Sequence, residues 1–129
     1  MDASALVKRY VAEPGSDVVR EAMSEADGWF ICRVGFVETT RAVSLAAGQA
    51  AAKNFASEWP AFAVLEVDAT LIEHASLLTL SRDLRSLDAL HLAAALLLPA
   101  DGLVLATWDR RLHAAAAAEG LELLPTALV

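Results

Sequence analysis

Cysteine is nearly absent from this sequence, because Cys32 is the only one among 129 residues. A single thiol cannot form a disulfide within the chain, so the sequence favours a protein of a reducing compartment such as the cytoplasm. The lone cysteine and the three histidines do not occur at the spacings of zinc ligands. We therefore expect neither a disulfide-stapled scaffold nor a zinc site.

The sequence also lacks an apolar run long enough to cross a membrane. The longest nearly apolar stretch, residues 89–100, contains His91 and Pro99 and is shorter than the roughly 20 residues that a bilayer needs. At the amino terminus, Lys8 and Arg9 stand where a signal peptide would have its apolar core. We therefore expect a cytoplasmic protein that does not associate with membranes.

Basic residues are few: ten lysines and arginines stand against seventeen aspartates and glutamates, which gives a formal net charge of −7. A protein that binds nucleic acid through its overall charge usually has a basic surplus and gains from counterion release. This objection weakens if several acids are metal ligands, because each divalent cation cancels two negative charges. Any contact with a polyanion must then be local and assisted by metal.

Glycine and proline are few as well, while 57% of the residues are hydrophobic. This composition is typical of a globular protein, and the length suits one compact domain, which we place at residues 1–129. The spacing of apolar residues predicts helices that alternate with short strands. Because strands separated by helices form parallel sheets covered on both faces, we expect a three-layer α/β fold.

The expected strands are residues 29–32, 64–67, 103–106 and 121–124. The expected helices are residues 4–13 with Ser4 as N-cap, residues 14–26 led by Pro14, one that carries Glu38 and ends near Gly48, one that ends near Trp59, one that Asp68 caps and that ends near Ser81, one from residue 86 or 87 to before Pro99, and residues 108–119.

Four acidic residues lie close to the starts of helices. Asp2 precedes the first helix, Asp109 follows the strand at 103–106, and Asp88 and Glu38 lie in the first turns of apolar helices. Each has an ordinary structural explanation, since an acid at a helix start accepts hydrogen bonds from free N–H groups or complements the helix dipole. Glu38 and Asp88 are harder to explain in this way, because apolar neighbours favour burial and a buried carboxylate is costly unless it is paired or binds metal.

Carboxylates that gather at the carboxyl end of a parallel sheet repel one another unless a cation sits between them. Oxygen ligands alone suit Mg²⁺ or Mn²⁺ better than zinc. Such an ion can activate water, neutralise phosphate charge and stabilise the leaving oxygen. Phosphodiester hydrolysis is therefore the expected reaction, and the candidate metal ligands and catalytic residues are Asp2, Glu38, Asp88 and Asp109.

The segments around these acids form four motifs, of which the third is the most specific. They are Asp2-Ala3-Ser4, then Val37-Glu38 through Arg41-Ala42, then Leu84-Arg85-Ser86-Leu87-Asp88-Ala89-Leu90-His91, and last Thr107-Trp108-Asp109. In this order and at this spacing, over nearly the whole chain, they resemble the PIN domain family, and in particular the VapC-type toxins of bacterial toxin–antitoxin pairs.

The resemblance implies a PIN-like α/β fold with a short parallel central sheet, of four or five strands, flanked by helices. It implies an endoribonuclease that depends on Mg²⁺ or Mn²⁺ and cuts RNA with metal-activated water. It also implies a cognate antitoxin protein as partner, and self-association as a homodimer. By motif position the metal pocket comprises Asp2, Glu38, Asp88 and Asp109, and Ser4 and Thr107 support it by hydrogen bonds.

The chain departs from the family pattern at its start. Family members have a short apolar strand before the first aspartate, whereas here Met1 alone precedes Asp2. We expect either that the chain was started late or that its first strand is minimal. In both cases the carboxylate at residue two is expected to be poorly anchored.

Several other residues are secondary candidates. His91 lies one turn from Asp88, and packing near the core is the favoured explanation for it. Trp108 lies between Thr107 and Asp109 and is a candidate for base stacking. The arginines best placed to contact phosphate are Arg9, Arg41, Arg85, Arg110 and Arg111.

Two other functions fit parts of the sequence. The chain could be a PIN-like protein-interaction module with a degraded metal site, and RNA cleavage that needs Mg²⁺ would distinguish the two. It could also be a phosphoryl-transfer domain with Asp2 as nucleophile, although Ser4 stands where that chemistry usually has a second aspartate. All four motifs together favour the endoribonuclease.

Overall fold

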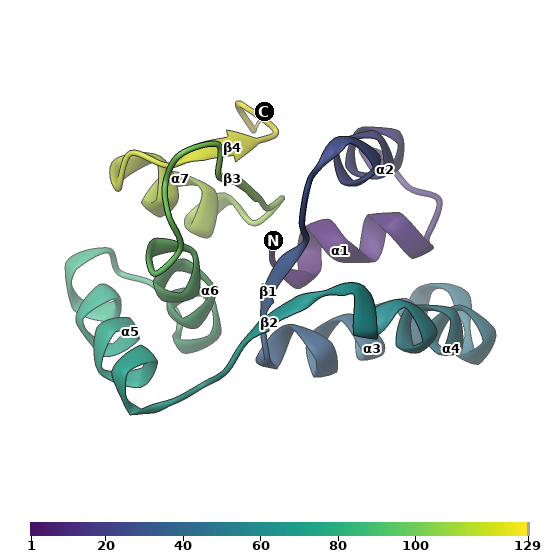
Figure 1. Ribbon diagram of the computed structural model, residues 1–129, viewed down its shortest axis with the longest axis horizontal. Helices are drawn as coiled ribbons and strands as arrows, with labels where there is room; N and C mark the ends of the chain where they lie inside the picture. The colour runs from purple at the N-terminus through teal and green to yellow at the C-terminus, as the bar shows by residue number, and fades with distance from the viewer. Residues whose placement is uncertain (129) are drawn as a thin grey trace.

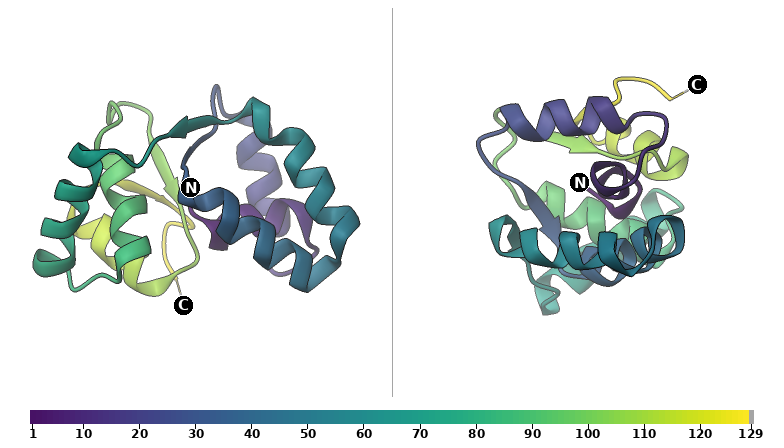
Figure 2. Two further views of the ribbon diagram at one scale, coloured as in Figure 1. Left: turned by 90° about the horizontal axis from the view of Figure 1, so that it is seen from below. Right: turned by 90° about the vertical axis from the view of Figure 1, so that its right-hand side faces the viewer.

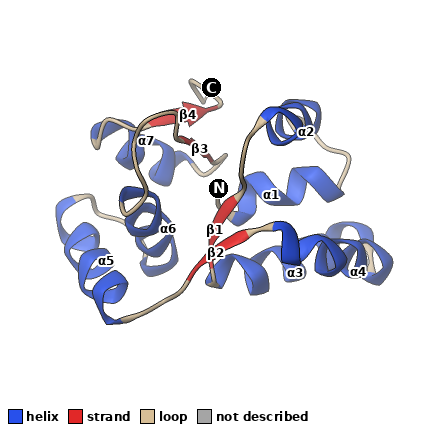
Figure 3. Ribbon diagram, in the orientation of Figure 1, coloured by secondary structure: helices blue, strands red, loops and turns tan. Residues whose placement is uncertain are grey.

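The structure, a computed structural model, describes residues 1–128 and consists of helices that alternate with short strands (Figures 1 and 3). The helices are α1 (Ala3–Tyr10), α2 (Ser16–Glu25), α3 (Val34–Ala47), α4 (Gln49–Glu58), the 3₁₀ turn η1 (Trp59–Ala61), α5 (Ala69–Ser81), α6 (Ser86–Leu96) and α7 (Arg110–Ala118). The strands are β1 (Phe30–Cys32), β2 (Ala63–Leu65), β3 (Val104–Ala106) and β4 (Glu122–Leu124). The predicted order of helices and strands is confirmed.

The strands form two parallel pairs rather than one sheet. β1 pairs with β2, with Phe30 opposite Ala63, and β3 pairs with β4, with Val104 opposite Glu122. The α/β fold with short parallel strands flanked by helices is therefore confirmed. The single sheet of four or five strands is not, because within residues 1–128 the strands hydrogen-bond only in these two pairs.

Met1 and Asp2 lie between the two pairs and hydrogen-bond to both. The Met1 amino group donates to the carbonyl of Phe30 (3.1 Å), and the Asp2 N–H donates to the carbonyl of Ala106 (3.2 Å). The two residues thus connect the edge of β1 to the end of β3, as a very short strand would. This contact joins the two strand pairs, which also share one apolar core through Cys32 of β1 and Leu105 of β3.

An apolar groove of about 680 Å³ continues from Met1 between the two strand pairs. Its lining includes the residues that precede β1, back to Asp27, and those that precede β3, back to Asp101. Ala94 of α6 and the following Leu98 are among the apolar residues that line it. The groove therefore lies where residues of an extended segment would run if they preceded Met1.

Two apolar cores lie in the two halves of the molecule, with α1 to α4 gathered in one half and α5 to α7 in the other (Figure 2). In the first half Phe55 is fully buried and contacts the rings of Tyr10, Phe36 and Trp59. In the second half every residue of segment 89–95 is buried, which explains the nearly uniform apolar sequence of α6. Among residues 1–128 there is no helix with the length and apolar character to cross a bilayer.

Several helix boundaries differ from the sequence-based prediction, and α1 ends at Tyr10 rather than at residue 13. Asp2, and not Ser4, caps α1, and Asp109 caps α7, because an aspartate carboxylate accepts the free N–H groups at least as well as a serine does. Helix α2 begins after Gly15, so Pro14 does not lead it. Gly15 has a φ of +92°, a left-handed conformation that a residue with a side chain adopts only with strain.

The groove beyond Met1 predicts that an added strand would stabilise the fold. An extension of four residues (Val-Thr-Val-Ile) before Met1 should lie in the groove, where burial of its apolar side chains outweighs the entropy lost on ordering. We expect a gain of about 1–2 kcal/mol, and a Tm higher by about 3–8 °C in thermal unfolding. A Gly-Ser extension of equal length is the control, and equal Tm values for the two extensions would contradict the geometry.

Candidate active site

Asp2 is the most firmly held of the four predicted acids, and it is only 4% exposed. Its Oδ1 accepts hydrogen bonds from Ser4 Oγ (2.7 Å) and from the Ala5 N–H (3.1 Å), while Oδ2 accepts one from Thr107 Oγ1 (2.8 Å). The prediction that residue two is poorly anchored is therefore wrong. Its physical reason is that α1 begins directly after Asp2 and the loop after β3 closes over it.

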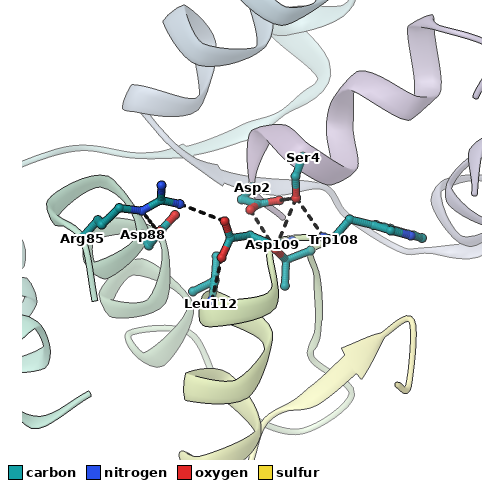
Figure 4. Close-up of polar contacts among 8 residues, drawn as sticks. Asp2, Ser4, Arg85, Asp88, Trp108, Asp109 and Leu112 are labelled. Atoms are coloured by element: carbon teal, nitrogen blue, oxygen red, sulfur yellow. Dashed lines mark hydrogen bonds and ion pairs between the residues drawn. The ribbon is translucent and has the colours of Figure 1, made fainter. Parts of the chain in front are cut away.

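Ser4 and Thr107 join the start of the chain to the loop that follows β3 (Figure 4). Ser4 Oγ accepts a hydrogen bond from the Trp108 N–H (2.8 Å), and Thr107 Oγ1 accepts one from the Asp109 N–H (3.1 Å). Thr107 is fully buried. Two hydroxyl groups thus link Asp2 to the backbone N–H groups of Trp108 and Asp109, although Asp2 and Thr107 are 105 positions apart in the sequence.

Asp109 uses one carboxylate oxygen to cap α7 and turns the other toward Arg85. Oδ1 accepts a hydrogen bond from the Leu112 N–H (2.9 Å), and Oδ2 accepts one from Arg85 Nη2 (2.9 Å). The preceding Trp108 packs under Lys8, whose Nζ lies 5.0 Å from the ring centroid. Asp109 therefore has one oxygen committed to the fold and one directed into the site.

Asp88, in the first turn of α6, contacts the same arginine. Arg85 Nε donates to Asp88 Oδ2 (3.1 Å), so one guanidinium bridges Asp88 and Asp109 (Figure 4). Burial raises the pKa of Asp88, the negative charge of Asp109 raises it further, and that of Asp2 adds a smaller effect, against the lowering effect of Arg85. The site thus holds more negative charge than its own arginine balances.

Glu38 pairs with a histidine rather than with the other three acids. Its Oε1 lies 2.6 Å from His91 Nε2, and the His91 side chain is 3% exposed. His91 follows Asp88 by three residues on α6, so the two lie on one face of that helix. The prediction that His91 packs near the core is confirmed, and Glu38 of α3 contacts a residue that lies one turn from Asp88 on α6.

The donor chemistry of the site fits a hard divalent cation, since all four acids offer carboxylate oxygens and the pKa of Asp88 is raised by burial and, to a lesser degree, by the negative charge of Asp109. The acids do not yet meet at one point. In the part of the chain that the structure describes, no three Asp, Glu, His or Cys side chains are close enough together to hold a metal ion. The physical reason is that Arg85 stands between Asp88 and Asp109 while His91 holds Glu38.

Of the predicted phosphate contacts, Arg85 lies in the site and Arg9 does not. Arg9 donates two hydrogen bonds to Glu58 (3.1 and 3.0 Å), and its guanidinium lies 4.7 Å from the centroid of the Trp29 ring. Arg9 therefore ties α1 to α4. The bridging role of Arg85 was visible in the sequence only as its spacing of three residues from Asp88.

The chain is similar in sequence to one protein family and to several named proteins. The family model described as "PIN domain" matches residues 1–118. Ribonuclease VapC45 and Ribonuclease VapC49 of Mycobacterium tuberculosis are each 35% identical over 136 residues, which cover 98% of this chain and 94% of the relative. Ribonuclease VapC46 of the same species is 34% identical over 124 residues, covering 96% and 94%.

A solved structure has the same fold. The crystal structure of Mycobacterium tuberculosis VapC20, described as a toxin that cleaves the sarcin–ricin loop, superposes with a TM-score of 0.72 at 18% sequence identity. The match covers 88% of this chain and 92% of that one. At this identity the likeness shows the fold.

The hydrogen bonds of Thr107 predict that Thr107→Val destabilises the protein more than Thr39→Val does. Both threonines are fully buried, but the Thr39 hydroxyl has no hydrogen-bond partner among the described residues. Loss of the Thr107 hydroxyl leaves a buried oxygen of Asp2 unpaired, which costs about 1–3 kcal/mol, whereas the Thr39 change should be neutral or stabilising. Urea unfolding measures both, and equal stabilities would show that Thr107 does not hold Asp2.

The raised pKa of Asp88 predicts a pH-dependent cost in folding. The folded protein holds the Asp88 proton more tightly than the unfolded chain does. Protonated Asp88 therefore stabilises the fold at a pH below the unfolded pKa of 3.8, and this stability is lost as the pH rises through the raised pKa of the folded protein. Asp88→Asn removes this dependence.

In chelator, the Asp88→Asn variant should therefore have a higher Tm than the wild type at pH 7, and the two values should converge below pH 4. Thermal unfolding across this pH range measures the difference. A variant that is less stable than the wild type at pH 7 would mean that attraction to Arg85 outweighs the cost of burying the charge.

Proposed function

Because this chain belongs to the PIN domain family, we propose that it is an endoribonuclease and the toxin of a toxin–antitoxin pair. Relatives that match it over nearly their whole length bear the name ribonuclease. The observation that carries the proposal is that Asp2, Asp88 and Asp109, from three distant segments, share one neighbourhood in which Asp2 is fixed by three hydrogen bonds. Retention of this arrangement argues against a degraded interaction module.

The proposed reaction is hydrolysis of an RNA phosphodiester at Asp2, Asp88 and Asp109, with Glu38 completing the metal pocket. Mg²⁺ or Mn²⁺, when bound there, supplies the Lewis acid that activates water and neutralises phosphate charge. The start of α7 holds Asp109 through the Leu112 N–H, so this carboxylate need not be ordered when the substrate arrives. Preorganised side chains of this kind lower the cost of assembling the site.

Ser4 and Thr107 are proposed as positioning residues for Asp2. Both donate to its carboxylate, and both also accept a backbone N–H of the loop after β3. His91 has the corresponding part for Glu38, because it takes one carboxylate oxygen and leaves the other for the pocket. Asp2 and Glu38 are thus oriented by neighbours that are themselves fixed in the fold.

Local positive charge would let this acidic chain bind RNA. Arg110 and Arg111 directly follow Asp109 in the first turn of α7, and both are exposed. Arg85 contacts Asp109 Oδ2. A phosphate at the acids would therefore meet Arg85, and the adjoining turn of α7 adds positive charge within a net charge of −7, provided that a divalent cation balances the carboxylates.

A cognate antitoxin is proposed to bind across α3. Val37 and Leu45 on this helix are 67% and 70% exposed, although both are apolar. Val37 adjoins Glu38, so a partner on this face could place a basic side chain against the acids. Helix α1 offers no such surface, because its apolar Ala5 and Leu6 are fully buried.

We also propose that the chain forms one domain over residues 1–129, self-associates as a homodimer and acts in the cytoplasm. Apolar side chains exposed on α5 offer a surface for a second copy, since Leu77 is 66% and Leu80 is 84% exposed. This surface is separate from α3, so a dimer could still bind an antitoxin.

The proposed mechanism predicts that Asp109→Asn abolishes RNA cleavage while Asp68→Asn does not. Asp68 caps α5 as Asp109 caps α7, through a hydrogen bond from the Leu71 N–H (2.9 Å), and asparagine is an equally good cap at both places. The rate for Asp109→Asn should fall by about 100-fold or more, the scale for removing a charge-stabilising group from an active site. Cleavage of labelled RNA with Mn²⁺, with and without chelator, measures it.

Two outcomes would contradict this mechanism. One is cleavage by the wild type that persists unchanged in chelator. The other is an Asp109→Asn variant that is as active as Asp68→Asn while circular dichroism shows both to be folded. A wild-type protein that cleaves no RNA with either metal, yet binds a partner through α3, would favour the interaction module instead.

A further inference from the structure

Arg85 depends on two acids of the site for its position. Its Nε and Nη2 contact Oδ2 of Asp88 (3.1 Å) and Oδ2 of Asp109 (2.9 Å), and its side chain is 65% exposed. It stands directly before α6 in extended backbone and makes no side-chain cap to that helix. The guanidinium is therefore a surface cation that is held over the site by the acids themselves.

The carboxylate oxygens that Arg85 contacts are also those best placed for a ligand. Asp109 uses its other oxygen to cap α7 through the Leu112 N–H, and both oxygens of Asp2 already accept hydrogen bonds. A cation that bound Asp88 and Asp109 together would approach these same two Oδ2 atoms. The guanidinium of Arg85 already occupies the position that this cation would take.

We propose that Arg85 is a built-in counter-ion that competes with the divalent cation for Asp88 and Asp109 and then, once displaced, holds a phosphate of the RNA. The proposal rests on the proposed function, because it takes the acids to be metal ligands. One guanidinium leaves two carboxylates with a net charge of −1, whereas a divalent cation neutralises both. The exchange is easy because a solvent-exposed ion pair is weak.

The displaced Arg85 then lies at the rim of the site with its charge available. An RNA phosphate close to the metal offers two oxygens to the guanidinium, in place of the two carboxylate oxygens that it contacted before. In the absence of metal, Arg85 is occupied and the site is negative, so it repels a polyanion. Metal uptake would thereby create the local positive charge that RNA binding needs in a chain with a net charge of −7.

Isothermal titration of the full chain with Mn²⁺ tests the competition, using wild type, Arg85→Gln and Arg20→Gln. Arg20 pairs with Asp17 on α2 (3.8 Å), so its variant makes the same change in net charge without touching Asp88 or Asp109. Arg85→Gln should bind Mn²⁺ about fivefold more tightly than the wild type, because the cation no longer has to displace an exposed ion pair. Arg20→Gln should stay within about twofold, since salt screens distant charges.

RNA binding tests the second half of the proposal. Ca²⁺ also takes carboxylate ligands, so the affinity for a single-stranded RNA, shown by gel to stay intact, is measured in Ca²⁺ at several salt concentrations. With Ca²⁺, Arg85→Gln should reduce the slope of log K against log salt by about 0.7, the value for one phosphate contact. In chelator the wild type and the variant should have the same slope. An unchanged slope with Ca²⁺ would overturn the contact with RNA.

The two proposals fail in different ways. If the wild type took up no Mn²⁺ and cleaved no RNA, the metal-dependent function would be overturned. If the wild type bound Mn²⁺ and cleaved RNA, but Arg85→Gln bound Mn²⁺ equally or more weakly, only the role of Arg85 as a competing counter-ion would be overturned.

Discussion

The three hydrogen bonds of the Asp2 carboxylate are the constraint on which the candidate site depends. They fix the first turn of α1 and the loop after β3, while the backbone of Met1 and Asp2 joins both strand pairs. A site assembled from segments that are far apart in the sequence needs such a junction, because each segment alone would lose entropy on ordering without gaining a partner. Fold stability and the proposed catalysis thus share one side chain.

The rest of the site contains negative charge that its partners balance only in part. Asp88 and Asp109 share the guanidinium of Arg85, and Glu38 contacts His91, so each of these acids has a partner within the chain. Such partners lower the cost of bringing carboxylates together before any metal binds. In the proposed mechanism they also make RNA binding conditional, since the positive charge near the acids is occupied until a cation takes its place.

Local features of the sequence predicted most of the elements, whereas contacts between distant segments were not predictable. Asp68 caps α5 as expected, and the apolar segment 89–95 became the buried α6, because both depend on neighbouring residues. The division of the strands into two pairs depends on contacts between segments that are distant in the sequence, such as those of Met1 and Asp2 with β1 and β3. The four motifs indicated the acids, but the partners of Asp109 and Glu38 lie 24 and 53 positions away. The same reason explains the wrong prediction for Asp2.

The central claim is that Asp2, Asp88 and Asp109 bind one divalent cation together. Diffraction from a crystal grown with Mn²⁺, measured near the manganese absorption edge, tests it most directly. We predict an anomalous peak about 2.1 Å from carboxylate oxygens of at least two of these residues, with the Arg85 guanidinium moved away from them. The absence of such a peak, or a peak elsewhere with Arg85 still bridging Asp88 and Asp109, would contradict the claim.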